Sequence, residues 1–79
     1  MKDDGAVYFR VSTKDVHYVN RIFEGYEYVG VVSTVDRDRG ILVVRATPAT
    51  AATAREILTT LPIELQFIDG VEYESMYKQ

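Results

Sequence analysis

The chain has 79 residues, of which 47% are hydrophobic and 27% charged, so it has room for one hydrophobic core and not for two domains. It contains no cysteine, which excludes disulfide bonds and thiolate metal sites. The net charge is −3 and the basic residues are scattered singly. This distribution argues against nucleic acid as a partner, because phosphate binding relies on clustered Lys and Arg.

Residues 1–5 lack the basic start and apolar stretch of a signal peptide. No run of the sequence approaches the length of a membrane span. The absence of cysteine fits a reducing compartment. We therefore expect a cytoplasmic protein that does not contact a membrane.

The first predicted element is a strand over residues 6–11, because apolar and polar side chains alternate there. A helix should follow, with a side-chain cap from Ser12 or Thr13 and an apolar stripe at helical spacing. The stripe consists of Val16, Val19, Ile22, Phe23 and Tyr26. Gly25 should end the helix in the left-handed conformation.

Two segments rich in β-branched residues, 29–35 and 41–47, predict a β-hairpin around residues 36–40. Its turn should be a three-residue loop in which Gly40 takes a left-handed conformation and forms a bulge. Residues 36–40 also carry two carboxylates and a glycine, a faint likeness to a calcium loop, but the closing glutamate is missing. We therefore interpret this segment as a turn.

After Pro48, apolar residues at helical spacing predict a second helix that stops at Pro62. Residues 63–68 alternate again and predict a fourth strand. The predicted organisation is a flexible N-terminus over residues 1–5, a single α+β domain over 6–68 and a C-terminal tail over 69–79.

The order strand, helix, hairpin, helix, strand predicts an α+β fold of the ferredoxin-like βαββαβ type. In this two-layer sandwich, a four-stranded antiparallel sheet carries both helices on one face. The other face must meet water, the tail or a partner.

The hairpin is apolar on both sides, so it presents aliphatic side chains to the helix-free face in either register. The predicted interface residues are Val31, Val35, Ile41 and Val43. We expect this surface to bind a second copy of the chain or another protein. The alternative is that the tail folds back over it. The apolar residues of the tail are Val71, Tyr73, Met76 and Tyr77.

Arg10 and Arg45 lie on the two strands predicted to be central in the sheet. If both point away from the helices, they form a cationic spot near Tyr8 that can grip a small carboxylate or phosphate. The alternative is an ion pair with Glu64 on the fourth strand.

No residue pattern predicts catalysis, a cofactor or a metal site. His17 is the sole histidine and lies beside the apolar stripe of its helix, where a solvent-facing role is the simplest interpretation. RNA-recognition domains share this order of elements and stack bases on aromatic side chains of the central strands. Residues 41–45 contain no aromatic residue, which argues against that function.

Four segments of the sequence, 8–11, 20–27, 32–36 and 40–44, resemble a family of short bacterial proteins, domain of unknown function 4911. The resemblance covers about residues 7–68 and leaves the tail outside. It implies an independent bacterial domain of uncharacterised role and carries no catalytic residues over. The order of elements also resembles small-molecule regulatory domains of the amino-acid-binding type, but residues 12–15 stand in place of their glycine-rich turn.

Overall fold

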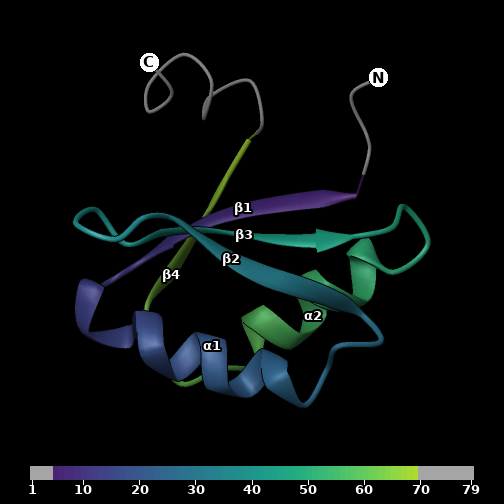
Figure 1. Cartoon of the computed structure of the whole chain (residues 1–79), viewed down its shortest axis with the longest axis horizontal. Helices are drawn as coiled ribbons and strands as arrows, with labels where there is room; N and C mark the ends of the chain where they lie inside the picture. Colours follow the sequence, from purple (N-terminus) through teal and green to yellow (C-terminus); the bar gives the residue numbers. More distant parts are fainter. Residues whose placement is uncertain (1–4, 70–79) are drawn as a thin grey trace.

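A computed structural model describes residues 5–69 of the chain as seven elements of secondary structure (Figure 1). The elements are β1 (Ala6–Val11), the 3-10 helix η1 (Thr13–Asp15), α1 (Val16–Glu24), β2 (Gly30–Asp36), β3 (Ile41–Ala46), α2 (Ala51–Thr59) and β4 (Leu65–Ile68). The predicted tail begins at residue 69, and its residues 70–79 lie outside the described residues.

The four strands form one antiparallel sheet in the order β2-β3-β1-β4. Figure 1 shows both helices on the same side of this sheet. The predicted α+β two-layer sandwich is therefore confirmed. Strands β1 and β3 are the central pair, so β2 and β4 are the two edges.

The hydrophobic core lies between the sheet and the helices. On β1 and β3 it contains Phe9, which lies opposite Leu42, and Val7, which lies opposite Val44. Helix α1 adds Val16, Val19 and Phe23, and helix α2 adds Ala51, Ala54 and Leu58. Each large side chain buried in this way contributes roughly 1.5 to 3 kcal/mol to folding.

The helix α1 ends at Glu24, directly before Gly25 as predicted, but the capping at both of its ends differs from the sequence prediction. No side-chain oxygen caps the helix, and the turn is instead closed by the Asp15 N–H, which donates to the Ser12 carbonyl at 2.8 Å. Gly25 follows the helix with φ −88°, which is not the left-handed conformation. The predicted hydroxyl cap and left-handed Gly25 were therefore wrong, because backbone hydrogen bonds of short turns satisfy both ends.

The hairpin turn confirms the left-handed glycine but not the loop length. Gly40 has φ +71°. Because Asp36 pairs with Ile41, the loop has four residues, and the bulge lies between Thr34 and Asp36 of β2 rather than at the glycine. Asp36 determines this geometry, since its carboxylate accepts the Arg39 N–H at 3.1 Å and lies 3.6 Å from the guanidinium. The Asp36 carboxylate thus stabilises the turn, in agreement with the interpretation of residues 36–40 as a turn.

Thr50 links α2 to the beginning of β2. Its hydroxyl donates to the Val29 carbonyl at 2.8 Å, far away in the sequence. The helix ends at Thr59, before Pro62, and β4 begins at Leu65 rather than at the predicted residue 63. Bends over 61–63 follow from Pro62, which cannot donate a ladder hydrogen bond.

Alanine substitution of Gly40 should destabilise the domain far more than alanine substitution of Gly25. A Cβ at Gly40 would overlap the Val11 carbonyl and force a residue with a side chain into positive φ, at a cost of about 2 kcal/mol or more. At Gly25 a Cβ would make only an ordinary contact, 3.6 Å from the Ile22 carbonyl, so Gly25→Ala should stabilise by about 0.4 to 1 kcal/mol. Urea unfolding of both variants measures the difference, and equal effects would contradict this account of the hairpin.

Candidate functional site

The helix-free face of the sheet is defined by the residues that alternate with the core residues. Because Phe9 and Leu42 point toward the helices, their neighbours in sequence point away from them. The helix-free face thus comprises Ala6, Tyr8, Arg10, Val31, Ser33, Ile41, Val43, Arg45, Gln66 and Ile68.

Two of the four predicted interface residues have no exposed surface. Ile41 and Val43 are 0% exposed although they point away from the helices, and neither belongs to the core cluster between the helices and the sheet. Val31 is 61% exposed, and Val35, the extra residue of the bulge, is half-buried. As the single chain stands, Val31 and Val35 are therefore the members of the predicted interface that another molecule can reach.

Among residues 5–69, no strand pairs with the outer edge of β2. The Val11 N–H of β1 donates to the Gly40 carbonyl, and the Ala46 N–H donates to the carbonyl of Gly5, the residue before β1. Even-numbered residues of β3 therefore direct their backbone groups toward β1, and odd-numbered residues direct theirs toward β2. The β2 residues opposite those odd-numbered residues, Val31 and Ser33, point back to β3. Val32 and Thr34 therefore direct their N–H and C=O groups outward.

Pairing of this edge with another strand is hindered at the two ends of β2 only. The Gly30 N–H is already used, because it donates to the Tyr26 carbonyl at 3.3 Å, and the bulge at Val35 interrupts the ladder. Between them, β2 carries no charged side chain and no proline, the two features that usually prevent edge strands from pairing with another chain.

The structure separates the two arginines that the sequence analysis grouped. Arg10 pairs with Ile41 and Arg45 pairs with Ala6, so they share the helix-free face at opposite ends of the central strands. Because Arg10 lies opposite Ile41, the two arginines are four positions apart along the strands, a distance of roughly 13 Å. Tyr8 lies between them and is half-buried. Arg10 and Arg45 thus do not form one compact cationic spot around Tyr8.

The predicted ion pair with Glu64 is also absent from the described residues. Arg10 lies opposite Gln66 of β4, and the salt bridge found within residues 5–69 joins Asp36 and Arg39 instead. Neither Arg10 nor Arg45 has a side-chain hydrogen bond or ion pair in this part of the chain.

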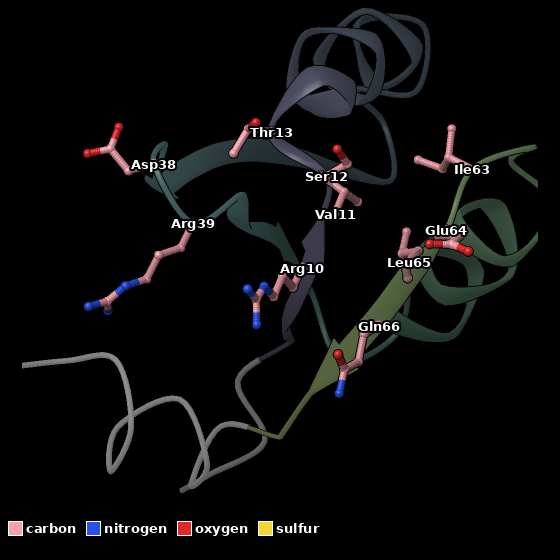
Figure 2. Close-up of a pocket in the computed structure, with 10 residues that line it drawn as sticks. All are labelled: Arg10, Val11, Ser12, Thr13, Asp38, Arg39, Ile63, Glu64, Leu65 and Gln66. Carbon is pink, nitrogen blue, oxygen red and sulfur yellow. The ribbon is translucent and has the colours of Figure 1, made fainter.

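Arg10 instead lines an open groove of about 800 Å³ together with the hairpin turn and the segment leading into β4. Figure 2 shows the side chains of Arg10 and Arg39 pointing to the same side, while Asp38 points away from them and Glu64 lies across the groove. The remaining lining residues are Val11, Ser12, Thr13, Ile63, Leu65 and Gln66. The groove has two positive and two negative side chains, so it suits a small polar molecule.

Arg39 was missed by the sequence analysis. It reaches the groove because the Val11 N–H donates to the Gly40 carbonyl at 2.9 Å, which holds the hairpin turn beside the end of β1. The signal that could have found it is the register of the β1–β3 pair, in which residues 10 and 41 lie opposite one another.

The histidine considered as a functional residue does not contribute to this groove. His17 lies on the exposed side of α1 and does not line the groove. Among residues 5–69, no group of three or more His, Asp or Glu side chains is arranged to hold a metal ion. Within residues 5–69, none of the helices has the length and apolar character that crossing a membrane requires.

Residues 9–65 match the model of a family described as a domain of unknown function (DUF4911). The chain belongs to this family. The DUF4911 match begins within β1 and ends at the first residue of β4, so it includes Arg10, Arg45 and all of β2. The predicted resemblance is therefore confirmed. No curated protein and no solved structure matches the chain.

Proposed function

We propose that this DUF4911 chain is a non-enzymatic interaction module that forms homodimers through the open edge of β2. The observation that carries the proposal is the outward backbone of Val32 and Thr34, flanked on the helix-free face by the exposed Val31. A strand edge of this kind pairs readily with an identical strand, because each copy supplies both donors and acceptors.

A two-fold axis near Ser33 gives the best register for such a pair. Val32 of one chain then lies opposite Thr34 of the other, and both outward-facing residues of each chain form ladder hydrogen bonds. In the same register Val31 of one chain lies opposite Val35 of the other, so the two accessible residues of the predicted interface pack together. The two sheets would join into one continuous sheet.

The proposal includes a bacterial, cytoplasmic setting. The absence of cysteine from the whole sequence supports a reducing compartment, and the family resemblance supports a bacterial source. The edge contact is small, and interfaces of less than about 1,200 Å² are typical of weak association. The dimer should therefore depend on protein concentration.

Replacing Thr34 by proline should weaken dimerisation at least roughly tenfold, which corresponds to about 1.4 kcal/mol. Proline removes an outward N–H without removing a ladder bond to β3, and edge strands tolerate proline at such positions. Thr34→Val keeps the N–H and the β-branched shape, so it should dimerise like the unsubstituted chain. Light scattering over about 1 µM to 1 mM measures the association.

A chain that stays monomeric over this range would overturn the proposal, as would equal dimerisation of the proline and valine variants. Because proline can perturb the fold, circular dichroism should confirm that Thr34→Pro remains native. A second pair of variants, at Val31, tests dimerisation without introducing a proline. Val31→Lys should weaken dimerisation because it replaces the apolar contact with Val35 of the other chain by a charged side chain, which disfavours edge pairing. Val31→Thr should weaken dimerisation less, and neither change disturbs the core because Val31 is exposed.

A second candidate function is the binding of a small carboxylate or phosphate, favoured by the position of Arg10 in the open groove beside Arg39. The Arg10 guanidinium makes no hydrogen bond or ion pair within residues 5–69, so it is available to an anion, and Arg binds such groups bidentately. Because Arg45 lies at the far end of the strand pair, the ligand site in this proposal no longer includes it.

Thermal-shift screening of carboxylates and phosphates tests this candidate. A ligand at one hundred times its dissociation constant should add about 2.7 kcal/mol of stability. Arg10→Gln should abolish the shift, and Arg45→Gln should preserve it because Arg45 does not line the groove. Loss of the shift in both variants, or in neither, would contradict binding in the groove.

A further inference from the structure

The groove at the end of β1 carries opposite charges on its two sides. Arg10 and Arg39 point to the same side of it, whereas Glu64 lies across the groove from them (Figure 2). The sheet register explains this placement, because Arg10 lies opposite Gln66 and Glu64 comes two residues before Gln66. Arg10 and Glu64 are therefore diagonal neighbours on adjacent strands, at a spacing of roughly 7 to 8 Å.

Arg10 and Glu64 do not neutralise each other. The salt bridge found within residues 5–69 joins Asp36 and Arg39. In the same part of the chain, neither the Arg10 guanidinium nor the Glu64 carboxylate has a hydrogen bond or an ion pair. Both residues are exposed. Each side chain thus keeps its capacity to bind a charged group of a ligand, the guanidinium as a donor and the carboxylate as an acceptor.

The uncharged lining of the groove suits a short organic chain. Ser12 and Thr13 contribute hydroxyl groups, and Gln66 contributes an amide. Hydroxyl and amide groups can donate to a carboxylate and accept from an ammonium group. The half-buried Ile63 and Leu65 contribute apolar surface, against which the carbon atoms of a ligand can lie.

The balance of charge distinguishes between classes of ligand. Arg10 and Arg39 are offset by Asp38 and Glu64, so the groove has no net positive charge. A phosphate or a dicarboxylate would bring further negative charge toward the Glu64 carboxylate, and like charges at short range oppose binding. A molecule that carries one carboxylate and one ammonium group satisfies Arg10 and Glu64 together.

Building on the second candidate function, anion binding at Arg10, we propose that the groove binds a small zwitterion, with its carboxylate at Arg10 and its ammonium group at Glu64. The diagonal spacing of the two side chains requires several atoms between the two charged groups of the ligand. The ligand class is therefore that of ω-amino acids. Exposed ion pairs contribute little energy each, so the dissociation constant should be roughly millimolar.

Three probes of equal chain length test the proposal on the full chain. The compound δ-aminovalerate carries both charged groups, valerate carries the carboxylate alone and pentylamine carries the ammonium group alone. Titrations at one fixed ionic strength, followed by amide chemical shifts, should show that δ-aminovalerate binds about fivefold more tightly than either of the other two. The shifts should occur in residues 10–13 and 63–66, and the amides of β2 should not respond.

Variants at the two ends of the groove separate the contributions. Glu64→Gln should weaken δ-aminovalerate binding about fivefold, because it removes the partner of the ammonium group, and it should not weaken valerate binding. Glu56→Gln is the matched control, since Glu56 is an exposed residue of α2 that does not line the groove, and it should change neither affinity. Arg10→Gln should remove the binding of both carboxylates.

The failure of this proposal can be told apart from the failure of anion binding itself. Equal affinities for δ-aminovalerate and valerate, or equal effects of Glu64→Gln and Glu56→Gln, would overturn the zwitterion proposal and leave anion binding at Arg10 in place. Binding of neither carboxylate, or shifts that lie outside the groove, would overturn both. Dimerisation through β2 is measured separately by light scattering and does not depend on either result.

Discussion

The structure depends on the burial of β3 on both faces. Leu42 and Val44 pack against the helices, and Ile41 and Val43 are equally buried on the opposite side. Four consecutive residues without solvent contact are typical of a strand enclosed between two layers. The helices form one such layer, and both lie on the same face of the sheet (Figure 1). The order β2-β3-β1-β4 places β3 in the central pair, with a strand on each side.

Because both faces of β3 are buried, the open edge of β2 is the surface at which another chain can extend this sheet. Strand β2 has outward backbone groups at Val32 and Thr34 and one strongly exposed aliphatic side chain, Val31. The polar groove at Arg10 is a separate feature, formed where the hairpin turn meets the end of β1. A small domain with a limited core gains stability when such an edge is paired.

The sequence predicted the order of elements, the bounds of β1 and the left-handed Gly40, because alternation, helical spacing and glycine conformation are local properties. It could not predict that Arg10 and Arg45 lie at opposite ends of the central pair, since register depends on pairing between distant segments. It also could not predict the burial of Ile41, because periodicity identifies a face but not what lies over it. The groove residue Arg39 was missed for the same reason, as its position follows from tertiary pairing.

Amide hydrogen exchange of β2 at low and high protein concentration tests the proposed dimer most directly. The amides of Val32 and Thr34 point to the open edge, so their exchange should slow as concentration rises. The amides of Val31 and Ser33, which point to β3, should change little. Exchange at Val32 and Thr34 that is fast and independent of concentration would contradict pairing of the β2 edge with a second copy.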